Sequence, residues 1–472
     1  MQCRRCRIFI WTAVVLLMLA SCQGGLAPDT PSPAPDATTT AAPPPTALLP
    51  TPPPPPVAVN TAPTVAPDAP MVAAATTGAA AYGYTHLRAD GNRVVEGKGQ
   101  LPQLAPLDIP LAGRPRWVVA LPLAEGALWA VVLEDNSTQA FQVVGRQVSP
   151  VSVIPQTLER TAPLLTIVDG QASFLVPPTG SPGGNHPILL PEEDDLAFSN
   201  AAGELFLVDK SARGLGEVDV TILPDGRLLA DEQGRLLVLS GPTTRYEHGV
   251  LGDAVEASAV SLIEARPTAR VLYTISIPEP QVVEGIAPIW TDWDGDGERE
   301  IIVTVADARE GARVVVYDEA GEQLAAGPAI GQGYRWRHQI AVAPFGPGGE
   351  MELVDVLTPH LGGIVEFYQW TNNELRVVAQ VGGYTSHVLG SRNLDLAIAG
   401  DFDGNERYEL LLPNQARSEL GAIRRTGDGA EVAWSVELGG TLSSNTAAVT
   451  LANGDIAVAA GRQDGILRIW QP

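Results

Sequence analysis

The sequence contains no cysteine after position 22. Its three cysteines are Cys3, Cys6 and Cys22. Residues 23–472 therefore cannot form a disulfide, and they offer no thiol as a nucleophile or a metal ligand. Cys3 and Cys6 form a C-x-x-C pair, but a zinc site of this kind needs further ligands that no second cysteine pair supplies.

Positive charge is also scarce. The chain has 30 Lys and Arg residues against 54 Asp and Glu residues, which gives a formal net charge of -24. Nucleic-acid binding rests mainly on Lys and Arg contacts to phosphate. The composition therefore excludes nucleic acid as a default partner.

Aromatic residues make up only 6% of the chain, whereas glycine (48) and proline (41) are abundant. This composition disfavours helical bundles and favours short strands joined by turns. At 45% hydrophobic residues, the chain still has enough apolar side chains for a sizeable core.

Sequence signatures of catalysis are missing as well. The six histidines show no H-E-x-x-H or other compact metal-binding spacing, and no serine lies in a G-x-S-x-G motif. Gly331-Gln332-Gly333 is too short for a dinucleotide fingerprint. We assign no catalytic residues, and a binding protein is favoured over an enzyme.

The first 22 residues resemble a bacterial lipoprotein signal. A basic start precedes the apolar run 8–20, which is too short to span a bilayer. Residues 19–22, Leu-Ala-Ser-Cys, resemble the lipobox of bacterial lipoproteins. The resemblance implies that residues 1–21 are removed, that Cys22 receives lipid such as palmitate, and that the protein is anchored outside the cytoplasm. Gln23 lacks resemblance to the aspartate that retains lipoproteins at an inner membrane, which favours the outer membrane or the cell surface.

Residues 22–81 are predicted to form a tether. After the acylated cysteine, this segment consists almost entirely of alanine, proline, threonine and valine, including the proline run 52–56. Such a sequence has too little bulky apolar surface to fold, and its prolines favour an extended polyproline II conformation. We expect a semi-rigid stalk between the membrane and a folded body.

Residues 82–472 read as an all-β body. Short runs rich in valine, isoleucine and leucine alternate with glycine, proline, aspartate and asparagine turns, and no helical stripe longer than two turns is present. The strongest predicted strands are Arg116–Leu123, Leu128–Glu134, Glu204–Asp209, Arg235–Ser240, Ile301–Val305, Arg313–Tyr317, Gly363–Trp370 and Gly465–Trp470.

A unit of about fifty residues recurs in the second half of the body. Ile286, Ile340, Leu396 and Ala447 each open a short apolar strand, at intervals of 54, 56 and 51 residues. A loop, a second strand that starts after an acidic residue, and a third strand follow each time. This is the size of one β-propeller blade, and a body of 391 residues predicts about seven blades of about 50–57 residues.

One loop in this repeat, Asp292–Glu300, has the pattern of a cation site; we call it the first acidic loop. It places carboxylates at alternating positions and a glycine at the sixth, so that oxygen atoms can surround one hard cation such as Ca²⁺. The loop runs into a predicted strand rather than a helix, which rules out an EF-hand. The expected ligands are Asp292, Asp294, Asp296, Glu300 and the backbone carbonyl of Glu298.

A second copy, Asp401–Glu409, lies two repeats later; we call it the second acidic loop. Glu406 replaces the glycine at the sixth position, so its turn is expected to be strained and its binding weaker. The D-x-D-x-D-G-x-x-D/E pattern between two blade strands resembles the FG-GAP and VCBS repeats of integrin-α-like propellers. The resemblance implies calcium binding, with ligands in the second copy from Asp401, Asp403, Asn405, Glu409 and the carbonyl of Arg407.

Aromatic and basic side chains precede the first strands of two neighbouring repeats. We expect them at one rim of the propeller, where they could contact a sugar or a peptide, although ordinary loop packing is the competing interpretation. The candidate ligand-binding residues are Tyr334, Trp336, His338, Tyr384 and His387.

The sequence thus predicts a monomeric, lipid-anchored, calcium-binding propeller that acts as a binding or adhesion module for a protein or a glycan outside the cytoplasm. Two alternatives remain open at this point. One is an extracellular carbohydrate-active enzyme, a lyase or hydrolase on a propeller scaffold. The other is a scaffold for envelope assembly.

Overall fold

The structure is a computed structural model that describes residues 82–156, 158, 162–175, 186–190, 195–209 and 213–472. The chain separates into two units, Met1–Thr64 and Val65–Pro472, and every described residue belongs to the second unit. The predicted signal peptide, the lipidation of Cys22 and the tether fall outside the described residues. Within those residues, no helix has the length and apolar character needed to cross a membrane.

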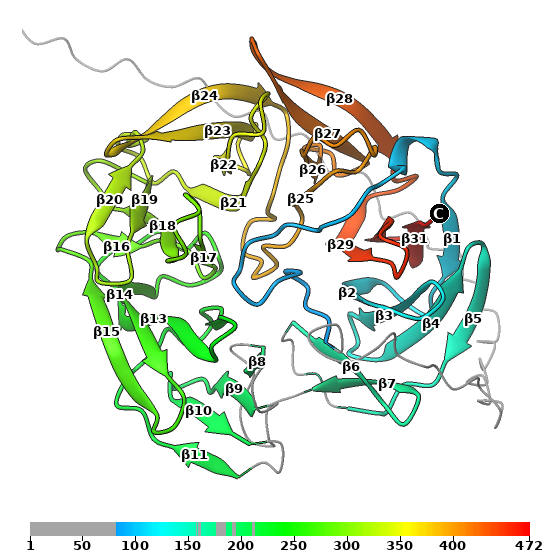
Figure 1. The fold of residues 1–472 in the computed structure, drawn as a ribbon, viewed down its shortest axis with the longest axis horizontal. Coiled ribbons are helices and arrows are strands. Elements are labelled where there is room, and N and C mark those ends of the chain that lie inside the picture. Colours follow the sequence, from blue (N-terminus) through cyan, green and yellow to red (C-terminus); the bar gives the residue numbers. More distant parts are fainter. Residues whose placement is uncertain (1–81, 157, 159–161, 176–185, 191–194, 210–212) are drawn as a thin grey trace, which may run out of the picture. The chain divides into compact units, whose positions relative to one another are not determined.

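Strands are nearly the only regular secondary structure of the described residues (Figure 1). A short 3-10 helix, η2, covers Leu101–Gln103. The strands of the first half are β1 (Leu107–Pro110), β2 (Pro115–Pro122), β3 (Ala127–Leu133), β4 (Thr138–Val144), β5 (Gln147–Val151), β6 (Leu164–Val168), β7 (Gln171–Leu175), β8 (Ile188–Leu190), β9 (Asp195–Ser199), β10 (Leu205–Val208), β11 (Gly214–Gly216), β12 (Leu229–Ala230), β13 (Arg235–Thr243), β14 (Glu256–Glu264) and β15 (Arg270–Ser276).

The second half continues the same pattern of short antiparallel strands. Its strands are β16 (Val282–Val283), β17 (Ile289–Thr291), β18 (Glu300–Ala306), β19 (Arg313–Tyr317), β20 (Gln323–Ala326), β21 (Arg337–Ala343), β22 (Glu352–Leu357), β23 (Ile364–Thr371), β24 (Glu374–Gly382), β25 (Ile398–Gly400), β26 (Glu409–Pro413), β27 (Glu419–Thr426), β28 (Gly429–Glu437), β29 (Leu442–Thr450), β30 (Ile456–Arg462) and β31 (Ile466–Trp470).

Consecutive strands pair into blades, and the unit is a β-propeller. Antiparallel neighbours form the groups β2–β5, β8–β11, β12–β15, β16–β20, β21–β24 and β25–β28, and a further group joins β29–β31 to β1. The first strands of neighbouring blades contact one another, and the blades surround a common centre in Figure 1. The predicted propeller fold is therefore confirmed.

The last blade is closed by a strand from the other end of the unit. β1 pairs antiparallel with β31, with Leu107 opposite Ile469 and Ile109 opposite Leu467. Closure of this kind joins the two ends of the ring and removes a free sheet edge. The sequence analysis did not anticipate this pairing.

The blade number stays a prediction. In addition to the seven groups of four or five strands, the described residues contain one two-stranded sheet, β6–β7. Single bridges add Gly83 beside Leu165 and Val153 beside Ala172 to this sheet. Segments that follow β7 lie outside the described residues, so the described strands alone do not fix the count at seven.

The core follows from burial of both faces of the inner strands. Every residue of β3, β18, β21 and β30 is buried. β3, β18 and β30 lie between two strands of their own sheet, whereas β21 is an edge strand that contacts strands of the neighbouring blades. Such strands read as continuous apolar runs. The outer strands β15, β24 and β28 instead mix exposed and buried residues.

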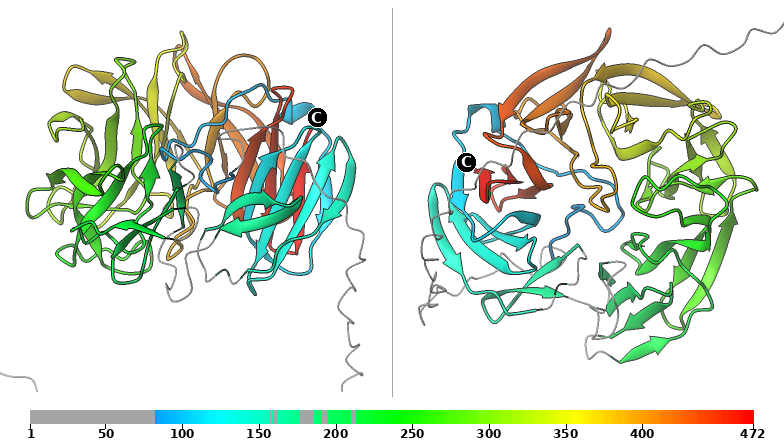
Figure 2. Two further views of the ribbon diagram at one scale, coloured as in Figure 1. Left: turned by 60° about the horizontal axis from the view of Figure 1, so that its bottom comes forward. Right: turned by 180° about the vertical axis from the view of Figure 1, so that it is seen from behind.

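Residues 83–101, which we call the N-terminal strap, run along the inner strands of several blades (Figure 2). The Asn92 side chain donates to the Val342 carbonyl at 2.9 Å and accepts from the Val342 amide at 3.0 Å. Val94 pairs with Ala399 in β25, and Lys98 pairs with Asp455 before β30. The strap therefore fills part of the centre of the ring.

The strongest predicted strands match the structure closely. Arg313–Tyr317 is reproduced as β19, and Arg116–Leu123 differs from β2 by one residue at each end. The first strands of two repeats begin later than predicted, at Ile289 rather than Ile286 and at Ile398 rather than Leu396.

Candidate functional site

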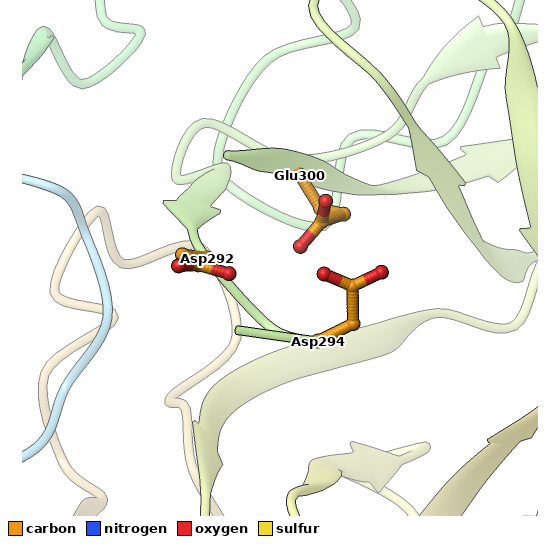
Figure 3. Close-up of side chains that lie close together, drawn as sticks. All are labelled: Asp292, Asp294 and Glu300. Atoms are coloured by element: carbon orange, nitrogen blue, oxygen red, sulfur yellow. The ribbon is translucent and has the colours of Figure 1, made fainter. Parts of the chain in front are cut away.

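The first acidic loop connects β17 to β18 and gathers three carboxylates. Asp292, Asp294 and Glu300 each offer an oxygen, and these oxygens lie within 4.8 Å of one another. Figure 3 shows the carboxylates of Asp294 and Glu300 facing each other, with Asp292 beside them. Oxygen ligands from three carboxylates are the donors that Ca²⁺ prefers.

The backbone of this loop holds Asp292 in place. Its carboxylate accepts hydrogen bonds from the amides of Gly295 at 2.7 Å and Gly297 at 3.1 Å. Both glycines have positive φ angles, 80° and 94°, which glycine adopts without a steric penalty. The D-x-D-G-x-G spelling thus dictates a turn that wraps around the first aspartate.

Glu300 supplies the buried side of the group. The Trp293 amide donates to its carboxylate at 2.6 Å. Burial, together with the charges of Asp294 and Asp292, raises the pKa of Glu300 to about 7. Among the described residues, no Lys or Arg forms an ion pair with these three carboxylates, so the donor set fits a divalent cation.

The other predicted ligands of this loop lie outside the carboxylate group. Asp296 and Glu298 are exposed, and the Glu298 amide donates to the Asp296 carboxylate at 2.8 Å. A cavity of about 310 Å³ borders Asp292, Gly297 and Glu298. The Asp296 side chain and the Glu298 backbone carbonyl therefore remain predicted ligands rather than members of the group.

The second acidic loop connects β25 to β26 and repeats the same arrangement. The carboxylate oxygens of Asp401, Asp403 and Glu409 lie within 4.8 Å of one another. The Asp401 carboxylate accepts from the Gly404 amide at 2.8 Å and from the Glu406 amide at 2.9 Å. Both predicted loops therefore fold alike.

The other three predicted residues of the second acidic loop, Asn405, Glu406 and Arg407, lie outside the carboxylate group. Glu406 has a φ of 68°, the left-handed conformation that glycine has at the matching position of the first loop, which agrees with the expected strain. The Asn405 amide group donates to Asp403 at 3.2 Å. The Arg407 guanidinium donates to the carbonyl of Arg425, so its side chain points away from the group.

A guanidinium that sequence analysis missed lies in the second carboxylate group. Arg424 of β27 donates to both Asp403 and Glu409, with a distance of 2.8 Å between Arg424 Nε and Glu409 Oε1. The register of the sheet explains this contact, because Glu409 and Arg424 are cross-strand partners. In the blade of the first acidic loop, Ile301 pairs with Tyr317, so the residue opposite Glu300, at the place of Arg424, is Asp318.

The second loop also packs on the N-terminal strap. The Gly99 amide donates to the Asp401 carbonyl at 2.7 Å, and Lys98 Nζ lies 2.6 Å from the Glu406 carboxylate. A Cβ atom on Gly404 would lie 2.6 Å from the carbonyl oxygen of Gly99. Gly295 and Gly297 of the first loop instead face open space.

The blade between the two loops has replaced this arrangement with an ion pair. Its acidic residue, Glu352 of β22, is buried and pairs with Arg425 of the next blade, with a distance of 2.9 Å between Arg425 Nε and Glu352 Oε2. Glu352 thus has the same place in its blade as Glu300 but a protein cation as its partner.

The predicted rim residues come together only in part, and most are buried. Trp336 stacks on His338 with a distance of 4.9 Å between ring centroids and meets His387 edge-on at 5.2 Å. All three side chains are less than 4% exposed. Tyr334 is exposed and lies beside Tyr246 instead, and Tyr384 is buried against Gly421. This burial removes most of the expected contact surface at the rim.

A larger cavity lies at the ends of the inner strands that are opposite to the acidic loops. It has a volume of about 950 Å³ and is lined by loops of several blades. Leu396 lines it just before β25, whereas the second acidic loop follows β25, so the cavity and the acidic loops lie on opposite faces of the ring. Its charged lining residues are Arg114, Arg116, Glu134, Asp225, Asp253, Arg392 and Arg417.

Charge is unevenly divided over this cavity. Arg392 is paired with Asp225 at 2.7 Å and with Asp253 at 2.6 Å. Arg417 forms no ion pair among the described residues, and burial together with the charge of Arg114 lowers its pKa. Arg114 is paired with Glu134 at 3.7 Å, so the lining contains four arginines against three carboxylates in an otherwise acidic protein.

Comparisons with known proteins support the fold and go no further. No family model matches the chain, and no curated protein matches it. Among solved structures, a europium-containing methanol dehydrogenase has a TM-score of 0.51 at 10% identity, over 80% of this chain and 90% of the other. BamB from Moraxella catarrhalis has a TM-score of 0.41 at 11% identity, over 77% of this chain and 96% of the other. The Dos1 propeller has a TM-score of 0.38 at 9% identity, over 79% of this chain and 96% of the other. The resemblance of the two loops to FG-GAP and VCBS repeats stays a prediction.

Proposed function

We propose that this chain is a calcium-binding β-propeller that acts as a binding or adhesion module for a protein or a glycan. In this proposal Cys22 is lipidated, residues 22–81 form the tether, and the propeller is held outside the cytoplasm of a bacterium, at the outer membrane or the cell surface. A full shell of protein oxygens around calcium fixes a turn and leaves no strong Lewis-acid position, so the cation would be structural.

The observation that carries the proposal is the carboxylate group of the first acidic loop. Asp292, Asp294 and Glu300 converge without a protein cation among the described residues. Three close carboxylates repel one another, and the raised pKa of Glu300 reflects this repulsion together with burial. A bound Ca²⁺ would relieve both effects.

The ligand-binding part of the proposal rests on the cavity of about 950 Å³. Loops from several blades converge on it, which is where propellers and barrels commonly place ligands. Arg114 and Arg417 offer guanidinium groups that recognise carboxylates or other anionic groups. Because the acidic loops lie on the opposite face, calcium would act on the stability of the ring rather than on the ligand itself.

Calorimetric titration of the full-length protein with CaCl₂ tests the calcium proposal. We expect one tight binding event, which Asp294→Asn removes by taking a carboxylate out of the group. Glu322→Gln is the matched control, because Glu322 is an exposed carboxylate in the same blade that lies outside the group. Unchanged binding in Asp294→Asn, or no binding in the unmodified protein, would contradict the assignment.

Terbium luminescence can assign the event to one loop. The first acidic loop contains Trp293 and the second has Phe402 at the same position. Tryptophan transfers excitation energy to a bound terbium ion, so excitation of tryptophan should report the first loop. Replacement of Trp293 with Phe should remove the signal while calcium binding persists.

A further inference from the structure

Two buried guanidinium groups share one carboxylate at the centre of the ring. The Asp395 carboxylate accepts from Arg93 Nη1 at 3.1 Å and from Arg227 Nη2 at 3.0 Å to each oxygen. Thr85 Oγ1 donates to the same carboxylate at 2.7 Å. Arg93 and Thr85 belong to the N-terminal strap, whereas Arg227 and Asp395 precede β12 and β25. The cluster therefore joins the strap to two separate blades.

This cluster has an unbalanced positive charge. Burial would raise the pKa of Asp395, but the adjacent guanidinium groups of Arg227 and Arg93 hold it below its usual value, so it is ionised. Burial lowers the pKa of Arg93 to about 10, so Arg93 stays protonated at neutral pH. Neither arginine forms an ion pair with another carboxylate among the described residues. Two cations and one anion leave one buried positive charge, which is unfavourable without a partner.

Hydrogen-bond donors around the same cluster lack partners. Arg93 Nη2, His186 Nε2, His338 Nε2 and both ring nitrogens of His86 are buried without a hydrogen-bond partner within the described part of the chain. Buried donors and acceptors in folded proteins are nearly always paired with protein, water or an ion. These atoms therefore point to a partner that the described residues do not supply.

The three histidines are neutral and close to the guanidinium groups. Burial lowers the pKa of His86 and His338 well below the usual value, and it lowers that of His186 to about 3. The charges of Arg93 and Arg227 act on both His86 and His338. The rings of His86 and His186 lie 4.6 Å apart. A neutral imidazole keeps one N–H, so each ring can donate one hydrogen bond.

We infer that the centre of the ring binds one small monovalent anion of the halide class, chloride in ordinary solution, beside Arg93 and Arg227. The anion balances the buried charge and accepts hydrogen bonds from Arg93 Nη2 and neighbouring imidazole N–H groups. A metal ion does not suit the site, because two guanidinium groups repel it and the one carboxylate already accepts four hydrogen bonds. Water could accept the hydrogen bonds but would leave the charge unbalanced.

Unfolding of the full-length protein in two salts tests this inference. Sodium chloride and sodium gluconate are compared at equal ionic strength and a fixed calcium concentration, because gluconate is too large for a buried halide site. Chloride should stabilise the fold in a saturable manner. At ten times its dissociation constant, it should raise the equilibrium constant for folding roughly tenfold. Equal stability in the two salts would overturn the inference.

Variants of Arg93 separate anion binding from structural damage. Arg93→Gln leaves Arg227 and Asp395 as a balanced pair, so the difference between the two salts should disappear, whereas Arg93→Lys should keep it. Arg376→Gln is the control, because Arg376 is an exposed arginine that pairs with Glu374. A chloride effect that persists in Arg93→Gln would contradict the site.

If Arg93→Gln does not fold, crystals of the unmodified protein soaked in bromide give the answer. An anomalous peak within hydrogen-bond distance of Arg93 Nη2 is expected, and a map without such a peak would overturn the inference. The anion site and the calcium proposal rest on different residues. Calcium binding without a chloride effect, or the reverse, would therefore distinguish failure of one from failure of the other.

Discussion

The two acidic loops have the same turn and the same three carboxylates, but they differ in what balances the charge. In the first loop, Asp292, Asp294 and the buried Glu300 converge without a protein cation among the described residues. In the second loop, Arg424 donates to two of the three carboxylates. The first group could hold an external cation, whereas the second already contacts a protein cation.

The difference in charge balance is caused by a residue outside the two acidic loops. Arg424 lies opposite Glu409 in the register of β26 and β27, and the matching position in the first blade is Asp318. A loop sequence can thus specify the turn and the carboxylates while the next strand decides whether a metal is required. Counting copies of the motif would predict two equal calcium sites, whereas our proposal is one strong site, because only the first group lacks a protein cation among the described residues.

Removal of Arg424 is the change with the largest expected effect. Arg424→Met leaves Asp403 and Glu409 as close carboxylates without their cation, which should cost about 3 kcal/mol of unfolding free energy in the absence of calcium. Calcium should then restore much of this stability, because the group now matches the first loop. Urea unfolding with calcium and with chelator measures both effects.

Arg376→Met is the control for this variant, since Arg376 is an exposed arginine whose ion-pair partner is Glu374. It should change neither the stability nor its response to calcium. If Arg424→Met were destabilised equally with and without calcium, Arg424 would have a packing role and the comparison of the two loops would fail.

The reverse change should weaken the first site. Asp318→Arg places a guanidinium where Arg424 stands in the second blade, and we expect calcium affinity to fall at least tenfold, or about 1.4 kcal/mol. The Asp318 carboxylate also accepts from the Glu322 amide at 2.7 Å. Asp318→Asn keeps this acceptor and removes only the charge, so it is the control in the calorimetric titration. Equal affinity in Asp318→Arg and Asp318→Asn would show that charge at this position does not govern binding.

The sequence predicted the propeller from a repeat of about fifty residues and from short apolar runs such as β18 and β19, which the structure buries. It did not predict closure by β1, since four residues near one end pair with a strand some 360 positions away. The position of Arg424 depends on strand register, which is set by packing and not by local pattern.

The central cluster shows the same limit more clearly. His86, Arg93 and Asp395 are separated by up to 309 positions and share no motif, so only the path of the N-terminal strap brings them together. The rim residues show the converse. Their proximity was expected from the repeat, but burial of Trp336 and His387 depends on which side the loops fold toward.

The smallest expected effect concerns the position where a glycine of the first loop is replaced in the second. Glu406 has a φ of 68° at the place of Gly297, and a side chain in this left-handed conformation is disfavoured by contact of Cβ with the backbone. Glu406→Gly should therefore stabilise the second loop, although the greater freedom of glycine in the unfolded chain offsets part of the gain. The equilibrium constant for unfolding should fall by no more than about fivefold. Glu406→Gln keeps the backbone strain and removes the ion pair with Lys98, so it isolates the contribution of that ion pair. Thermal unfolding of both variants measures the two effects. If Gly and Gln had the same effect, the contact with Lys98 and not the turn would account for the difference between the two loops.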